Sequence, residues 1–400
     1  MKHSKSMTYL LASGSVALAL LMVRYPETAV KASYAGLSIW WKSVFPALFP
    51  FFVISEMMIG FGVVRFAGVL LEPIMKPLFK VPGIGGFVLM MGMVSGFPAG
   101  ARITSRLYQE KKLSRTDAER LSSFTNFSNP LFLFSVTAVD FFGQPSLGIL
   151  FAIAHYAGNI CVGLLMRFYK KEAGQSHKVH TPSVFAKALS DMHQERIENY
   201  QPFGKMLGDA VISSVTTLLA VGGFIALFSM IYQLLFQVGI IAQLGIILSH
   251  LFAGIGLSPN LGPASVPGIF ELTIGANTIG ATSAPLLERV VLVSALLGFC
   301  GLSIQAQAIS ILSQAGLSVK PFLIGRLFQA LFSGGIAFFL YGWLHMSNKI
   351  EARATLASPF IRSIDSYSHS ILESGPWITI AGLLLFIYLL LRRTFHLQKA

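Results

Sequence analysis

The stretch SGFPAGAR (Ser95–Arg102) decides the fold class of this chain. It follows an apolar run, GIGGFVLMMGMV (83–94), which has the composition of a membrane helix but is too short to cross a hydrocarbon core of about 30 Å. Two glycines and a proline then turn the chain, and an arginine follows. Broken backbone at membrane depth is tolerated only where protein or water covers it. The stretch therefore predicts the tip and exit of a re-entrant hairpin.

The composition of the whole chain indicates a membrane protein. Its 400 residues are 54% hydrophobic and 12% charged, whereas soluble domains carry about 25% charged residues. Because backbone groups in lipid must pair within their own segment, the apolar runs predict helices, and the fold class is all-α. The net charge of +13 lies between these runs, so we expect the lipid bilayer, and no nucleic acid, as a partner.

About eight transmembrane helices are predicted. The first of these is either a retained helix or a cleaved signal peptide within residues 1–30. Retention is favoured because Arg24 and Pro26 follow the apolar run directly. The predicted spans are 8–23, 43–62, 122–140, 147–166, 211–236, 290–312, 321–343 and 377–391.

The order of features repeats after roughly 170 residues. Each half reads as helix, interfacial segment, hairpin, helix and helix, and the second hairpin is expected within 262–285. Both hairpins are rich in glycine and proline. The predicted organisation is a transmembrane helix with an outer loop (1–40), a first repeat (41–170), a cytoplasmic loop (171–205), a second repeat (206–345), and an outer loop with a C-terminal helix and basic tail (346–400).

The charges predict that the two repeats are inverted. The segments 64–80 and 102–120 carry three and six Lys or Arg, whereas their counterparts 238–256 and 272–289 carry none and one. The positive-inside rule then places the first pair in the cytoplasm and the second pair outside. Counting the spans puts both termini in the cytoplasm. Inverted repeats with broken helices are typical of secondary transporters.

The hairpin tips supply the first candidate binding residues. In the first hairpin, the turn formed by Gly96, Pro98 and Gly100 leaves backbone groups to face a ligand, and Arg102 either contacts an anionic ligand or marks the cytoplasmic side. The second hairpin offers polar side chains within an uncharged run, and kinks satisfied by neighbouring helices are the structural alternative. These side chains are Glu271, Thr273 and Asn277.

The helix after each hairpin supplies the second set. In SFTNFSNPLF (123–132), Asn126 and Asn129 share one face, and Pro130 frees the carbonyl of Asn126 from its helical bond. The counterpart GFCGLSIQAQAIS (298–310) supplies Ser303, Gln305 and Gln307. Such groups suit a substrate or coupling-ion site, although interhelical hydrogen bonding explains them equally well.

Other charged residues within the helices give weaker signals. Glu56 is either an ion-coupling carboxylate or the partner of a buried base. His155 reads as a satisfied core histidine, and Arg326, close to Lys320, as a side chain that snorkels to the interface. Motifs of hydrolases and phosphate-binding loops are lacking, and the two cysteines offer no metal cluster. We therefore expect no enzyme, no metal and no cofactor.

Three stretches carry a resemblance to a known family. GFPAGARITSRLYQ (96–109), TNFSNP (125–130) and SVPGIFELTIGA (265–276) resemble the YlbJ family of sporulation integral membrane proteins, over about residues 40–345. The order of elements also resembles the nucleoside-recognition, or gate, domains of concentrative nucleoside transporters. Where those carriers have polar side chains at the first tip, this chain has Phe97, Pro98 and Ala99.

The resemblance implies a multi-pass transporter, in the cell membrane and more narrowly in the outer forespore membrane, that moves dipicolinate during spore maturation. Glu271 would then be the proton- or sodium-linked residue, because a bare carboxylate would repel an anion. The alternatives are a nucleoside or nucleobase carrier and a gate-domain scaffold that transports nothing. A homo-oligomer is compatible with each of these functions.

Overall fold

The computed structural model describes residues 5–170 and 184–354, and within these ranges the chain forms helices and no strands. It divides into two units, Met1–Tyr341 and Gly342–Ala400. Of the second unit, the structure describes only the end of the last helix, through Ala354. The predicted span 377–391 and the basic tail lie outside the described residues. The first unit carries every candidate site residue.

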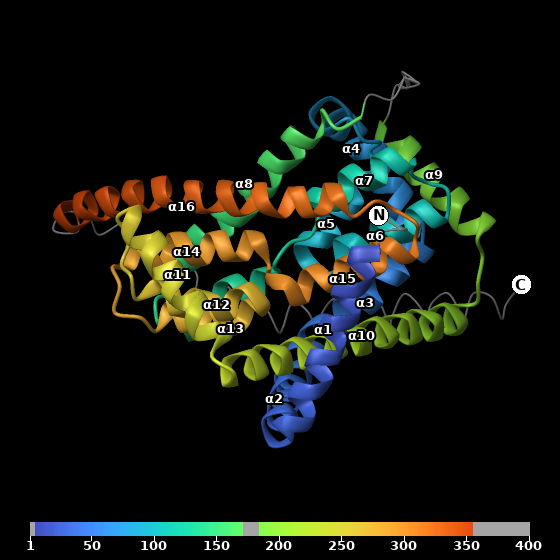
Figure 1. The fold of residues 1–400 in the computed structure, drawn as a ribbon. Helices are drawn as coiled ribbons and strands as arrows, with labels where there is room; N and C mark the ends of the chain where they lie inside the picture. The colour runs from blue at the N-terminus through green and yellow to red at the C-terminus, as the bar shows by residue number, and fades with distance from the viewer. Residues whose placement is uncertain (1–4, 171–183, 355–400) are drawn as a thin grey trace, which may run out of the picture. The chain divides into compact units, whose positions relative to one another are not determined.

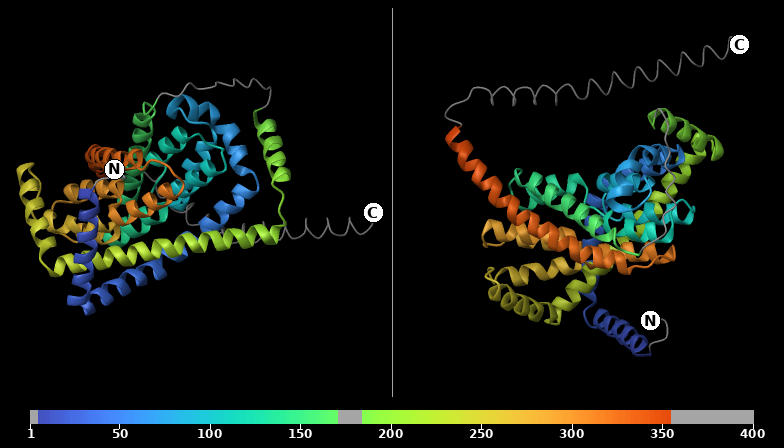
Figure 2. Two further views of the ribbon diagram at one scale, coloured as in Figure 1. Left: turned by 45° about the vertical axis from the view of Figure 1, so that its right-hand side comes forward. Right: turned by 90° about the horizontal axis from the view of Figure 1, so that it is seen from above.

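The first unit opens with helices that precede the repeat. The chain turns between α1 and α2 by 103°, so the predicted outer loop before residue 40 is largely helical. α2 packs along the long helix α10, as Figure 2 shows. The elements are α1 (Lys5–Arg24), α2 (Pro26–Ile39) and the π-helical turn η1 (Trp40–Val44).

The first half then runs as a helix, a second helix set at 83° to it, a hairpin, a broken helix and a closing helix. The predicted span 122–140 is the broken helix, because five residues without helical structure separate its two parts. The elements are α3 (Phe45–Gly60), α4 (Val63–Phe79), α5 (Ile84–Ser95), α6 (Ala99–Gln109), α7 (Arg115–Phe124), the π-helix η2 (Phe132–Phe141) and α8 (Leu147–Met166).

The second half repeats this order of elements (Figure 1). Its closing helix runs along α14, since a Cβ at Gly298 would lie 2.7 Å from the carbonyl oxygen of Gln329. The elements are α10 (Phe203–Gln237), α11 (Ile240–Gly254), α12 (Leu261–Phe270), α13 (Leu272–Gly280), α14 (Leu286–Phe299), α15 (Gly301–Gln314) and α16 (Lys320–Ala354).

Membrane spans follow from helix length and composition. Within the described ranges, four helices are long and apolar enough to cross a bilayer, and the bent pairs α1–α2 and α3–α4 raise this number to six. The sequence predicts about eight; the difference comes from the broken first-half helix and from the span that lies outside the described residues. The four are α8, α10, α14 with α15, and α16 as far as Trp343.

The predicted loop at 171–205 contains a helix, α9 (Val184–Glu198), that packs on α4. Its Glu195 carboxylate accepts hydrogen bonds from Arg65 at 2.9 Å and from Lys112 at 2.6 Å. Burial would raise the pKa of the Glu195 carboxyl, but these two hydrogen bonds lower it below its usual value. These two ion pairs therefore attach α9, in the connection between the halves, to basic residues of the first half.

Candidate functional site

The first hairpin encloses the break that follows it. The five residues Thr125–Asn129 are not helical, and the carbonyl oxygen of Thr125 enters the fork between α5 and α6. A Cβ at Gly92 or Gly100 would lie only 2.2 or 2.1 Å from this oxygen, so neither position has room for a side chain. The glycines of the hairpin therefore serve this close approach as well as the turn.

Asn126 and Asn129 complete the helix ends at this break. The side-chain oxygen of Asn126 accepts a hydrogen bond from the N–H of Ala101 at 3.0 Å, and its amide donates to the carbonyl of Ser122 at 2.9 Å. The side-chain oxygen of Asn129 accepts from the N–H of Phe132 at 2.8 Å. Both residues therefore satisfy backbone groups that a helix terminus leaves open.

The second hairpin turns at Glu271, between α12 and α13. Its carboxylate is 6% exposed and accepts a hydrogen bond from the N–H of Ile274 at 2.8 Å, as a helix cap does. Thr273 is half-buried in the first turn of α13. Asn277 is exposed about one turn further along, so the structure does not bring it to the tip.

The second break lies at Cys300 and Gly301, between α14 and α15, and it also rests on the hairpin of its own half. A Cβ at Gly301 would lie 3.0 Å from the carbonyl oxygen of Gly268 and 3.2 Å from the nitrogen of Leu272. Gln305 reaches back across this break and donates to the carbonyl of Phe299 at 3.0 Å. The same hairpin-on-break arrangement thus occurs twice.

Ser303 and Gln307 lie on α15 and are fully buried. The Gln307 amide lies 3.5 Å from the Ser303 hydroxyl. Contacts also cross between the halves, since α6 packs on α15 and α13 packs on η2. The two halves are therefore joined through α6 and α13 of their hairpins and through η2 and α15 of their broken helices.

Glu56 and Arg102, predicted to have separate roles, form an ion pair. The guanidinium of Arg102 donates to the carboxylate at 2.7 Å and also to the hydroxyl of Ser213 at 2.7 Å. Arg106 pairs with the second carboxylate oxygen. Glu56 is thus the partner of two arginines, of which Arg102 is 12% and Arg106 37% exposed. The charge of Arg102 is accordingly offset within the protein.

Side chains from α8 and α16 also contact the first break, although the sequence did not mark them as binding residues. His155 accepts a hydrogen bond from the N–H of Ser128 at 2.8 Å, and its other ring nitrogen lies 3.4 Å from the Gln329 amide. Arg326 is 0% exposed, so the prediction that it snorkels to the interface is wrong. The sequence did carry a signal for its burial, because Arg326, Gln329 and Ser333 lie on one face of an apolar helix.

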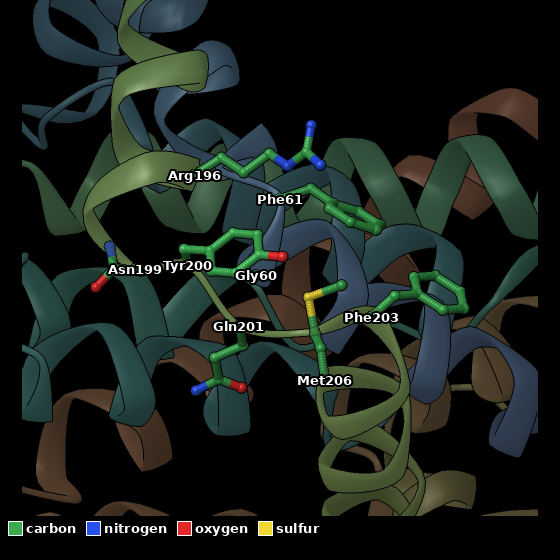
Figure 3. A pocket seen from close by; sticks show the side chains of 8 residues that line it. All are labelled: Gly60, Phe61, Arg196, Asn199, Tyr200, Gln201, Phe203 and Met206. Atoms are coloured by element: carbon green, nitrogen blue, oxygen red, sulfur yellow. The ribbon is translucent and has the colours of Figure 1, made fainter. Parts of the chain in front are cut away.

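A cavity of about 130 Å³ lies apart from the two hairpins and the two helix breaks. It opens at the corner of α3 and α4, next to the connection from α9 to α10 (Figure 3). None of the predicted site residues lines it. Its walls are Gly60, Phe61, Arg196, Asn199, Tyr200, Gln201, Phe203 and Met206.

Comparisons with known proteins identify close and distant relatives. The chain is 44% identical over 395 residues to the sporulation integral membrane protein YlbJ of Bacillus subtilis, and the match covers 97% of both chains. It is 25% identical over 158 residues to an uncharacterized protein of Alkalihalophilus pseudofirmus, covering 38% of this chain and 33% of the other. A family model described as nucleoside recognition, Gate, matches residues 41–145.

Two solved structures of CNTnw align with 14% sequence identity. A variant in an outward-facing state covers 85% of this chain and 87% of its own, with a TM-score of 0.39. The inward-facing, substrate-bound state covers 84% and 88%, with a TM-score of 0.41.

Proposed function

The chain belongs to the family of the sporulation integral membrane protein YlbJ, and we propose that it is a secondary transporter that carries a small organic anion, dipicolinate. In this proposal it works in the outer forespore membrane and serves spore maturation. The family relation and the four long apolar helices establish an integral membrane protein. The transported substrate and the particular membrane belong to the proposal.

One observation carries the transport proposal, namely that each hairpin rests on the helix break of its own half. The Thr125 carbonyl lies in the fork of the first hairpin, and Gly301 lies against the tip of the second. Secondary transporters bind substrate where half-helices end near the bilayer midplane, because open amides and carbonyls are available there. A scaffold would not require two such paired interruptions.

We further propose that the two halves are inverted in the membrane. Nine Lys or Arg in 64–80 and 102–120 would then lie in the cytoplasm, together with α9 and the ion pairs of Glu195. The second half has one basic residue in the corresponding segments, which suits the opposite side. Both chain termini would lie in the cytoplasm.

Glu271 is the favoured coupling residue. Among the described residues it has no ion-pair partner, whereas Glu56 is bound to two arginines. A carboxyl buried in a hairpin tip is stable there when it is protonated or holds a cation. Proton or sodium binding at Glu271 would offset the charge of an anionic substrate.

A nucleoside carrier is the second candidate, supported by the nucleoside-recognition model over residues 41–145. The first tip speaks against it, since Phe97 and Pro98 offer no polar side chain to a base or ribose. The N–H groups of Ala99, Ala101 and Arg102 at the start of α6 already have acceptors within the protein, so they favour neither ligand.

The test is uptake into vesicles that contain the purified protein. Labelled dipicolinate and labelled uridine are compared in the wild type, in Glu271→Gln, and in Glu27→Gln, which removes an exposed carboxylate on α2. We expect dipicolinate uptake that is lost or uncoupled in Glu271→Gln alone. Uptake of uridine without dipicolinate would replace the proposal by the nucleoside carrier, and folded protein that moves neither would favour the scaffold.

A further inference from the structure

A buried positive charge on α16 has no negative partner in the part of the chain that is described. The Arg326 side chain is 0% exposed, and it forms no ion pair with a described carboxylate. Its donors reach the carbonyls of Ser123 at 2.7 Å and Asn126 at 3.0 Å, and the side-chain oxygen of Asn159 at 3.2 Å. All three acceptors are neutral. Charges inside a membrane protein are costly and usually face a partner or a pathway.

This arginine lies between the two helix breaks. It donates to Asn126 in the first break, and the thiol of Cys300 in the second break lies beside its guanidinium. The side chain of Asn126 accepts a hydrogen bond from Ala101 in the first hairpin. Gly301, the residue after Cys300, lies against Gly268 and Leu272 of the second hairpin. Arg326 is therefore linked to the first hairpin through Asn126 and to the second through Cys300 and Gly301.

Unused hydrogen-bonding capacity extends along the same face of α16. Three fully buried atoms have no protein partner: Nε of Arg326, Oε1 of Gln329 and the hydroxyl oxygen of Ser333. The spacing of three and four residues places them in one row. Buried polar atoms normally find partners, and three open ones in a row indicate that a ligand or water completes them.

A purely structural role accounts for part of this arrangement. The carbonyl of Ser123 lies in the last turn of α7 and that of Asn126 just beyond it, where the helix dipole is negative, so the guanidinium acts as a cap. A dipole offers roughly half an elementary charge, however, and leaves the rest of the cation and its Nε unmatched.

We propose that Arg326 binds the carboxylate of the transported anion, which rests on the proposed function. Nε is the open donor, and a carboxylate that also bound the adjacent Nη2 would displace the longer of its two hydrogen bonds, the one to Asn159 at 3.2 Å. Arg102, the cation that the sequence points to, is less suited because Glu56 already holds it. The ligand would reach Arg326 when a hairpin moves off its break.

The test compares dipicolinate with its neutral diamide as ligands of the purified protein, by binding and by competition for uptake. Arg326→Gln removes the charge, and Arg326→Lys keeps it. Arg120→Gln is the matched control, since Arg120 is also buried and donates to the backbone carbonyls of Lys80 and Tyr169. We expect Arg326→Gln to reduce the preference for dipicolinate over the diamide at least about tenfold, because a hydrogen bond between charged groups is lost.

The control variant should retain that preference, and Arg326→Lys, which keeps the charge without the paired donors, should retain part of it. An unchanged preference in folded Arg326→Gln overturns the inference and leaves the proposed transport intact. Wild-type protein that binds uridine and neither dipicolinate nor another anion overturns both.

A second measurement needs no change at Arg326. With Cys161 replaced by alanine, Cys300 is the remaining thiol, and its alkylation by a maleimide reports access to the neighbouring guanidinium. Dipicolinate should slow the alkylation, and the diamide should not. Equal rates with both ligands would contradict the inference even if the arginine variants failed to fold.

Discussion

The guanidinium of Arg102 on the first hairpin lies 2.7 Å from the carboxylate of Glu56 on α3. Arg106, one turn further along α6, shares the same carboxylate. Through Ser213 the group also reaches α10, the first helix of the second half. Arg102 thus joins the exit of the hairpin to helices from both halves, to α3 through Glu56 and to α10 through Ser213.

Replacing Glu56 by glutamine should destabilise the protein by about 1 to 3 kcal/mol, since it leaves the guanidinium of Arg102 without its counter-ion, whereas Arg106 keeps Glu110. The expected loss is smaller than for a fully buried ion pair, because the Arg106 side chain is 37% exposed and water screens its charge. Thermal unfolding in detergent measures the change, with Glu27→Gln as the exposed control. Adding Arg102→Gln should restore part of the loss, and an unaltered unfolding temperature in Glu56→Gln would refute the role given to the pair.

Replacing Asn126 by alanine should weaken the attachment of the first hairpin. The change leaves the N–H of Ala101 and the carbonyl of Ser122 without their partner, at a cost of about 1 to 3 kcal/mol. Hydrogen exchange of the α6 amides measures the effect. We expect faster exchange at the start of α6 and unchanged exchange in α13, whereas a uniform increase over both hairpins would mean global destabilisation instead.

Gly100→Ala should prevent normal folding, because the new methyl group would meet the Thr125 carbonyl oxygen at 2.1 Å. The matched control is Gly223→Ala in α10, where no atom lies within 4 Å of the added Cβ. The control should be neutral or stabilising by up to about 1 kcal/mol through helix propensity. The yield of monodisperse protein and its unfolding temperature check both variants, and equal behaviour of the two would contradict the close approach.

The contact of α9 with α4 should depend on pH through Glu195. Its pKa is lower in the folded protein than the unfolded value of about 4.3, so the stabilisation is present above that value and is lost as pH falls through the folded pKa. Limited proteolysis near α9 at pH 7 and at progressively lower pH measures this loss. Glu195→Gln should release α9 already at pH 7, and Glu198→Gln, which changes an exposed carboxylate, should not.

The sequence allowed the hairpins and the breaks to be predicted, because glycine and proline act locally. Gly96 and Pro98 mark the first tip, and Pro130 follows the first break. The freed carbonyl of Asn126 was predicted from Pro130, but its partner Arg326 is 200 residues away and no local signal connects the two. Local patterns indicate where helices end; they do not indicate which distant side chain completes the end.

The helix α9 escaped prediction for the same reason. Its charged composition is typical of a loop, and its packing depends on ion pairs of Glu195 with Arg65 and Lys112, which lie 130 and 83 residues earlier in the chain. The exposure of Asn277 likewise depends on the rotation of α13 about its axis, which is set by its packing on α12 and not by the polar pattern alone.

The hydrogen bonds from α16 to the end of α7 have a consequence for biogenesis. Ribosomes add about 5 to 20 residues per second, so the 200 residues between Asn126 and Arg326 correspond to a delay on the order of 10 to 40 seconds. Once translation has passed Met166 the first half is complete, yet its broken helix awaits a partner still to be translated. Nascent chains stalled before Arg326 should therefore be preferred substrates of membrane proteases.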